Sequence, residues 1–308
     1  GVGMGMADLG LVVTPYFPAE FPTTNLIADL SMNVDPNKVD GQTIAFAYTG
    51  AISEYLFTDC PNCEEEYKSQ NQIFVGGGSS PPYLLLCTKP VTSMEEVQGA
   101  RLRVGGSLWS RWASYIGATS VTMPQNETYE ALSQGVIDCV ISSAPELTNF
   151  KLIEVVTDIT PAIPGGVFSG IANTINRDVW SGLTKAQRKT VLRGGAAFAA
   201  DMTWRYTIDA KRDIARVEND PEKRVHQASN DIVAKTEEFI ASDSSVLESR
   251  YNERYKDADV SSMISDFKAL LDTWIAKVEA ADITSKEDLK NLYWSEIYSK
   301  VDTGHYGL

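Results

Sequence analysis

The chain is poor in histidine and lacks the local motifs of the common enzyme classes. Its 308 residues include only two histidines, His226 and His305, although histidine is the most frequent acid–base group near neutral pH. The sequence contains no GxSxG, HExxH, Walker A or GxGxxG pattern. These are the signatures of α/β-hydrolases, zinc peptidases, P-loop enzymes and dinucleotide-binding enzymes. Their absence argues against catalysis and favours a binding protein.

Basic residues are also few. Lys and Arg number 27 against 41 Asp and Glu, so the formal net charge is −14 at pH 7. Nucleic acids and anionic membranes both require a basic face, so neither is an expected partner. A small anion can bind only where local donors outweigh the repulsion from the chain as a whole.

Long apolar runs are missing as well. No run reaches the roughly 20 residues that span a bilayer, and no segment has the character of a signal peptide. We therefore expect no direct membrane insertion and a soluble, mature or trimmed chain. With 43% hydrophobic and 22% charged residues, the chain is long and apolar enough for two lobes with their own cores.

The stretch from Arg101 to Ser142 alternates strand and helix patterns. In order, we expect a strand at residues 102–104, a helix that ends at Gly117, a strand at 120–123, a helix with Asn126 as its N-cap, and a strand at 136–141. Such alternation is typical of a parallel sheet with crossover helices.

Arg103 stands at the end of the first of these strands, directly before a helix. In parallel sheets, ligands bind where strand carboxyl ends meet helix N-termini, because free backbone N–H groups and the helix dipole favour negative charge. Arginine presents a planar fork of donors that can grip a carboxylate with two hydrogen bonds. The position equally fits a surface arginine that pairs with a nearby acidic residue.

Four blocks of sequence resemble the DctP-type substrate-binding proteins of TRAP transporters. In family order they are residues 98–104 (QGARLRV), 117–124 (GATSVTMP), 129–138 (YEALSQGVID) and 176–184 (NRDVWSGLT). The resemblance implies a periplasmic receptor that closes two lobes around an organic acid and offers it to a membrane permease. It also implies that Arg103 is the arginine that binds the carboxylate.

Further ligand-binding candidates follow from the resemblance. It implies that Thr14 and Tyr16 lie at a strand end facing the cleft, and Gln125 at the head of a helix beside it. Tyr83 matches a position that some members fill with a second arginine, which favours a ligand with a single carboxylate. Ser142 lies near the position where many members carry an asparagine that hydrogen-bonds the carboxylate.

Ser107, Trp109 and Phe168 are candidates from their own positions. Ser107 opens the helix after Arg103, where the helix N-terminus, like the one near Asn126, would help to neutralise a carboxylate. Trp109 in the same turn fits the core and the cleft wall equally well. Phe168 lies in a segment that should lead back toward the hinge.

We expect an α/β fold of the two-lobed periplasmic-binding-protein type, with mixed, mostly parallel sheets and a hinge. The predicted divisions are lobe I at residues 1–100, lobe II at 101–178, and a C-terminal part at 179–308 with a long helix, a return strand to lobe I and further helices. The long helix begins at Thr184 and runs to about Asn219, which at 1.5 Å per residue is roughly 50 Å, enough to cross both lobes. Family members carry about one more strand-helix-strand unit before residue 7, so we expect lobe I to lack that unit here.

The four cysteines occupy two kinds of position. Cys60 and Cys63 form a CxxC motif, which fits a redox pair, half a zinc site or a local disulfide. The histidines lie far away in sequence, and a thioredoxin-type motif follows a strand, whereas a helix precedes this one. We therefore expect a structural disulfide of an exported protein. Cys87 and Cys139 lie within apolar strands, and we expect them to be buried free thiols.

A glycine-rich run at residues 76–82 (GGGSSPP) separates two expected strands. It lacks the Lys-Ser/Thr pair and the helix of a phosphate loop, so we expect a mobile turn.

The sequence thus predicts a non-catalytic receptor for an organic acid, without cofactor or metal, that works in the periplasm with the permease subunits of a TRAP transporter. Dicarboxylates, keto acids, aromatic acids and sugar acids all fit one arginine in a polar and aromatic cleft. Two alternatives stay open, namely an α/β enzyme that acts on a small carboxylate and a binding protein of the ABC type.

Overall fold

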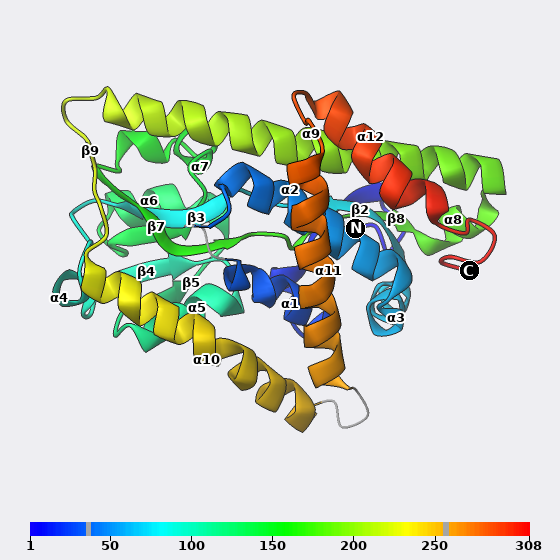
Figure 1. Cartoon of the computed structure of the whole chain (residues 1–308), viewed down its shortest axis with the longest axis horizontal. Helices are drawn as coiled ribbons and strands as arrows, with labels where there is room; N and C mark the ends of the chain where they lie inside the picture. The colour runs from blue at the N-terminus through cyan, green and yellow to red at the C-terminus, as the bar shows by residue number, and fades with distance from the viewer. Residues whose placement is uncertain (35–37, 255–258) are drawn as a thin grey trace.

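The protein is an α/β molecule with two β-sheets and long helices along its edges (Figure 1). The computed structural model describes residues 1–34, 38–254 and 259–308. One sheet has three strands and the other has six. The expected α/β class is confirmed.

The smaller sheet is antiparallel and has the order β1-β8-β2. Its strands are β1 (Leu9–Val13), β8 (Ile171–Asn176) and β2 (Gln72–Gly78). The prediction of a mobile turn was wrong for the three glycines, because Gly76 to Gly78 form the end of β2.

The larger sheet has the order β5-β4-β6-β3-β7-β9. Its strands are β5 (Thr119–Thr122), β4 (Arg101–Val104), β6 (Cys139–Ser142), β3 (Pro82–Cys87), β7 (Asp158–Val167) and β9 (Arg224–Val225). Strand β4 is parallel to β5 and β6, as the alternation in this stretch predicted. Strand β3 runs antiparallel to β6 and β7, so this sheet is mixed, with parallel pairing around β4 and between β7 and β9.

The strands do not separate at the predicted lobe boundaries. Strand β3 comes from residues 1–100 but lies in the six-stranded sheet, and β8 comes from residues 101–178 but lies in the three-stranded sheet. The strand at the place of the predicted return strand is β9. It pairs with β7 of the six-stranded sheet and not with β1 of the smaller sheet. The boundaries at residues 100 and 178 stay predictions.

Helix α9 (Lys185–Glu218) runs along the whole upper side of the molecule (Figure 1). Thr184 and Gln187 form a capping box at its start, and its 34 residues correspond to roughly 50 Å. The helix contacts β2 of one sheet and β9 of the other, so the prediction of a helix that spans both parts is confirmed.

Glycines let α9 approach β2 closely. A Cβ atom on Gly195 would lie 1.8 Å from the Val75 carbonyl oxygen, and one on Gly76 would lie 3.0 Å from the Gly195 carbonyl oxygen. Only glycine leaves room for this contact.

Further helices cover the sheets. They are α1 (Pro22–Ala28), α2 (Gly41–Thr58), α3 (Pro61–Ser69), α4 (Met94–Val97), α5 (Ser107–Tyr115), α6 (Thr128–Ser133), α7 (Glu146–Asn149), α8 (Arg177–Gly182), α10 (Asn230–Arg254), α11 (Val260–Ala280) and α12 (Lys286–Glu296). Short 3-10 turns include η1 (Thr14–Tyr16), η2 (Asp29–Asn33) and η3 (Gln125–Glu127). Among the described residues, no helix is both long enough and apolar enough to cross a bilayer.

Both cysteine pairs are disulfides. Cys60 and Cys63 are joined as predicted, with an S–S distance of 1.95 Å. The prediction of free thiols at Cys87 and Cys139 was wrong, since these residues are joined at 2.09 Å. They are register partners on the antiparallel strands β3 and β6, with Cα atoms 4.0 Å apart. Directly opposed residues of an antiparallel pair come this close, but the pairing of β3 with β6 is a tertiary feature.

Candidate functional site

A partly open cavity of about 180 Å³ lies where the two sheets and α9 meet. Six of the nine predicted ligand-binding residues line it: Tyr16, Tyr83, Arg103, Gln125, Ser142 and Phe168. Val13 and Ile171 contribute from the smaller sheet, and Met202 and Tyr206 contribute from α9. Residues far apart in the sequence are thus brought to one space, whose volume equals roughly six water molecules.

Arg103 is the only cation among the residues that line this cavity within the described chain. The side chain extends from β4 and is 1% exposed. Its Nε and Nη2 atoms donate to the Met123 carbonyl oxygen at 3.0 and 2.8 Å. Its Nη1 atom donates to the amide oxygen of Gln125, and its Nη2 atom lies 3.4 Å from the Tyr16 hydroxyl.

No acidic side chain of residues 1–34, 38–254 or 259–308 forms an ion pair with Arg103. The surface-arginine interpretation is therefore wrong. The Met123 carbonyl holds one edge of the guanidinium in place, while the other edge makes only neutral contacts. A buried guanidinium with neutral partners retains a strong preference for an anion.

Gly105 provides the space that this guanidinium occupies. A Cβ atom at Gly105 would lie 3.2 Å from Arg103 Nη1 and 3.3 Å from Nη2. These distances are shorter than ordinary van der Waals contacts, so a side chain here would displace the guanidinium.

Aromatic rings form one wall of the cavity. Tyr83 and Phe168 line it directly, with ring centroids 6.0 Å apart. Trp109 stacks on Tyr83 at 4.3 Å and donates from Nε1 to the Gly165 carbonyl at 3.1 Å. Trp109 therefore supports the wall from behind. Of the two interpretations of this residue, core or cleft wall, the structure favours the core.

The hydroxyl of Tyr83 stays protonated. Burial raises the pKa of Tyr83 well above its ordinary value, although the positive charge of Arg103 acts in the opposite direction. A neutral phenol beside the guanidinium can donate a second hydrogen bond to a carboxylate.

Besides Trp109, two more predicted ligand residues, Thr14 and Ser107, are not among those that line the cavity. Thr14 is fully buried, and its hydroxyl lies 3.4 Å from the Gly170 carbonyl. Ser107 donates its hydroxyl to the carboxylate of Asp29. The N-terminus of α5 therefore faces a carboxylate of the protein itself. Asn126 is not an N-cap, because it lies within η3 and α6 begins at Thr128.

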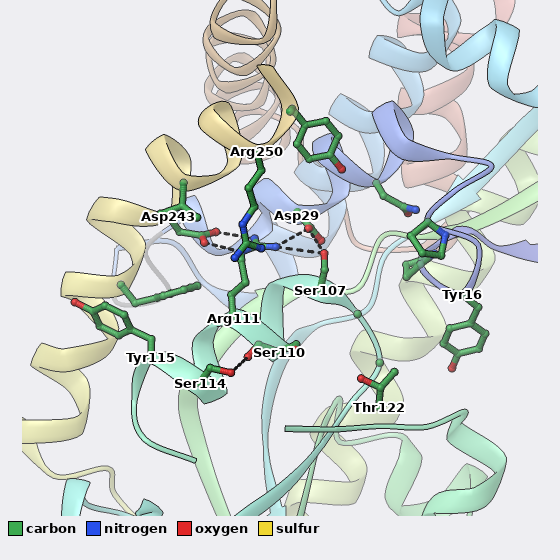
Figure 2. Close-up of a pocket in the computed structure, with 18 of the residues that line it drawn as sticks. Tyr16, Asp29, Ser107, Ser110, Arg111, Ser114, Tyr115, Thr122, Asp243 and Arg250 are labelled. Atoms are coloured by element: carbon green, nitrogen blue, oxygen red, sulfur yellow. Dashed lines mark hydrogen bonds and ion pairs between the residues drawn. The ribbon is translucent and has the colours of Figure 1, made fainter. Parts of the chain in front are cut away.

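A larger hollow of about 980 Å³ adjoins the cavity and shares Tyr16 and Gly105 with it. Figure 2 shows that Arg111 points between Asp29 and Asp243 in this hollow. The ion-pair distances are 2.9 Å to Asp29 and 2.7 Å to Asp243. Two carboxylates thus already neutralise Arg111, and Arg250 is a second cation that lines this hollow.

The sequence did not point to Glu146, Met202 or Tyr206, which also line the cavity. Met202 and Tyr206 lie four residues apart and therefore on one face of α9, but no local signal shows that this face meets the cavity. Glu146 begins α7 just beyond the carboxyl end of β6, a place where ligand contacts are common in α/β sheets.

Burial raises the pKa of Glu146 to about 7. The Tyr206 hydroxyl, the Asn149 side chain and the positive charge of Arg103 oppose this shift without cancelling it.

No group of three or more His, Cys, Asp or Glu side chains in the described residues is arranged to hold a metal ion.

Solved structures with the same fold are solute receptors. A TRAP periplasmic solute-binding protein from Bordetella bronchiseptica, solved with (R)- and (S)-mandelate, is 24% identical, and the match covers 91% of this chain and 83% of that chain with a TM-score of 0.72. A TRAP solute-binding protein from Rhodoferax ferrireducens, in complex with copurified benzoate, is 17% identical over 91% of this chain and 83% of that chain, with a TM-score of 0.73. These likenesses confirm the two-lobed fold.

Sequence comparison gives a shorter match and a longer one. A solute-binding protein from Albidiferax ferrireducens is 28% identical over 109 residues, which are 35% of this chain and 32% of that protein. The matched region thus spans about a third of the length of this curated relative. The family described as bacterial extracellular solute-binding protein, family 7 (DctP), matches residues 86–248, more than half of the chain. The chain therefore belongs to this DctP family.

Proposed function

We propose that this protein is a non-catalytic receptor that captures a small carboxylic acid in the cavity around Arg103 and delivers it to a TRAP-type membrane permease. The observation that carries the proposal is the buried Arg103 guanidinium, which lines a cavity and has only neutral partners. A carboxylate in the cavity would receive charge-assisted hydrogen bonds from Arg103 and a neutral one from Tyr83. The surrounding protein, at −14, repels anions elsewhere.

The ligands of the structural neighbours support this chemistry. Mandelate, benzoate and 3-hydroxybenzoate occupy three of those proteins, and pyroglutamate occupies another. All four are small acids with one carboxylate, which suits a cavity with one arginine and a tyrosine at the second position.

Delivery would require closure and release. We infer that the part built on the three-stranded sheet and the part built on the six-stranded sheet close on the acid about a hinge, with α9 as a scaffold along both. A ligand that contacts both lobes favours the closed form by its differential affinity. The protein would act in the periplasm, where its two disulfides are stable.

The test is a thermal-shift screen of small organic acids, followed by calorimetry on each acid that raises the melting temperature. Arg103→Ala should weaken the binding of every such acid by about 2–4 kcal/mol, because a desolvated carboxylate loses its charged partner. Unchanged affinity in this variant would contradict the proposal. So would chemical conversion of the bound acid, which NMR spectroscopy would detect.

A further inference from the structure

The cavity holds a second ionisable side chain besides Arg103. Glu146, the first residue of α7, is 7% exposed and lines the same space. Neither the composition nor the motifs of the chain pointed to this residue. A buried carboxylate in a site for carboxylates repels the ligand, unless another group of the ligand forms a hydrogen bond with it.

Two polar atoms of the cavity residues lack hydrogen-bond partners. The side-chain oxygen Oε2 of Glu146 and the amide nitrogen Nε2 of Gln125 are both buried and unpartnered. The orientation of the Gln125 amide follows from Arg103, since an arginine has no acceptor and the amide oxygen must face it. The cavity therefore presents one unused donor and one unused acceptor.

Unpartnered buried polar atoms destabilise a protein unless a ligand or a water molecule forms a hydrogen bond with them. A carboxylate bound at Arg103 can accept from the Gln125 amide as well. The same carboxylate cannot serve an ionised Glu146, because both groups are then acceptors, whereas a protonated Glu146 would donate to it. The ionised Glu146 requires a hydrogen atom from another part of the ligand.

The charge state of Glu146 fits this role. The titratable groups that face it are Arg103, Tyr206 and Tyr83. The raised pKa of about 7 reflects burial, and the phenols remain protonated because their own pKa values are raised. Near neutrality Glu146 keeps an acceptor oxygen in both its ionised and its protonated form.

We propose that Glu146 determines the specificity of this site, and that the solute is a small carboxylic acid that carries an O–H or N–H donor in addition to its carboxylate. This proposal rests on the proposed function and narrows its substrate class. The acids bound by the structural neighbours include both kinds, since mandelate and pyroglutamate carry such a donor and benzoate does not. The fold alone therefore does not choose between them, whereas Glu146 does.

An acid without the donor would leave Glu146 Oε2 buried and unpartnered in the complex. Sites built to hydrogen-bond a polar group discriminate strongly against analogues that lack it. We expect the protein to prefer the donor-bearing member of a matched pair by about 10- to 100-fold.

The test is calorimetry at pH 8, where Glu146 is mostly ionised, with three matched pairs of probes: mandelate and phenylacetate, 3-hydroxybenzoate and benzoate, and pyroglutamate and cyclopentanecarboxylate. For each pair that binds, the ratio of the two dissociation constants is measured in the wild type and in Glu146→Met and Glu146→Gln. Glu146→Met should bring the ratio close to one. Glu146→Gln, which keeps an acceptor oxygen, should retain most of the preference. The ratio cancels any general gain in affinity that comes from removing a negative charge.

The outcomes separate the two proposals. A preference that persists in Glu146→Met, or a wild type that binds both members of each pair equally, overturns the role of Glu146 and leaves an Arg103-dependent receptor standing. Failure of every acid to bind, or binding that is unaffected by Arg103→Ala, overturns both. Circular dichroism and thermal unfolding of each variant show that a changed ratio does not arise from misfolding.

Discussion

Arg111 on α5 forms an ion pair with Asp29 on η2 at 2.9 Å. This ion pair links a helix that covers the six-stranded sheet to a turn in the N-terminal part of the chain. The same guanidinium pairs with Asp243 on α10 at 2.7 Å (Figure 2). Burial raises the pKa of Asp29, and the charge of Arg111 together with the Ser107 hydroxyl acts against that shift. Three segments far apart in sequence thus depend on one arginine.

Arg111→Ala should destabilise the fold by about 3–5 kcal/mol, because it leaves two buried carboxylates without their cation. The measurement is urea unfolding at neutral pH. A double-mutant cycle with Asp29→Ala should give a coupling energy of about 0.5–3 kcal/mol. The matched control is Arg101→Ala, whose ion pair with Asp138 is solvent-exposed on the arginine side and should contribute far less. Equal losses in the two arginine variants would contradict the prediction.

Gly105→Ala should weaken acid binding with little effect on stability. The added Cβ atom would press on Nη1 and Nη2 of Arg103, the far end of a side chain, and would shift them by a few tenths of an ångström from the position that binds the acid. We expect a roughly tenfold rise in the dissociation constant, which corresponds to about 1.4 kcal/mol. Calorimetry with the best acid from the screen measures it.

Gly106→Ala provides a neighbouring control for this substitution. A Cβ atom there would make an ordinary contact of 3.5 Å with the Trp109 ring. If Gly106→Ala weakened binding as much as Gly105→Ala, the effect would belong to the loop and not to the guanidinium.

Glu146→Gln should flatten the pH dependence of stability in the ligand-free protein. The ordinary pKa of 4.5 applies to the unfolded chain, whereas burial raises the pKa to about 7 in the folded protein. The contribution of the protonated Glu146 to the free energy of unfolding is therefore fully present below pH 4.5 and is lost as the pH rises through about 7. The loss is roughly 3 kcal/mol by linkage.

Urea unfolding at pH 5 and pH 8 tests this expectation. The wild type should lose more stability between the two pH values than the glutamine variant, and the variant should be the more stable protein at pH 8. Parallel pH profiles for both proteins would show that Glu146 ionises normally in the fold.

Removal of the Cys87–Cys139 disulfide should destabilise the protein by about 4 kcal/mol, since a link between residues 52 apart restricts the unfolded chain strongly. The variant is Cys87→Ala/Cys139→Ala, and unfolding is followed without reductant. The control is Cys60→Ala/Cys63→Ala, where the separation is 3 and the expected loss is about 2 kcal/mol. A larger loss in the control would show that local packing around Cys60 and Cys63, not chain entropy, dominates.

Local patterns predicted the elements around Arg103 well. The Gly-Gly turn ends β4, helical spacing of apolar residues marks α5, and the capping box at Thr184 starts α9 where expected. Such signals depend on neighbours within a few residues in the chain, so they can be read without the fold.

Pairings between distant segments could not be read in this way. The disulfide partners Cys87 and Cys139 meet because β3 and β6 pair in antiparallel register. Gly76 belongs to a strand because β2 pairs with β8, where its register partner is Asn173. In both cases the sequence near the residue is compatible with several environments, and the long-range contact selects one.

By itself, the sequence indicated the family through its motifs and placed Arg103 at a strand end through local spacing. The resemblance, together with the place of Phe168 in the chain, pointed to the other five predicted residues that line the cavity. Only the tertiary structure decided what Arg103 pairs with, that Ser107 serves Asp29, and that Glu146 and Tyr206 complete the cavity. The physical reason is that burial and unpartnered polar atoms are properties of the packed molecule, where segments more than 40 residues apart enclose one space.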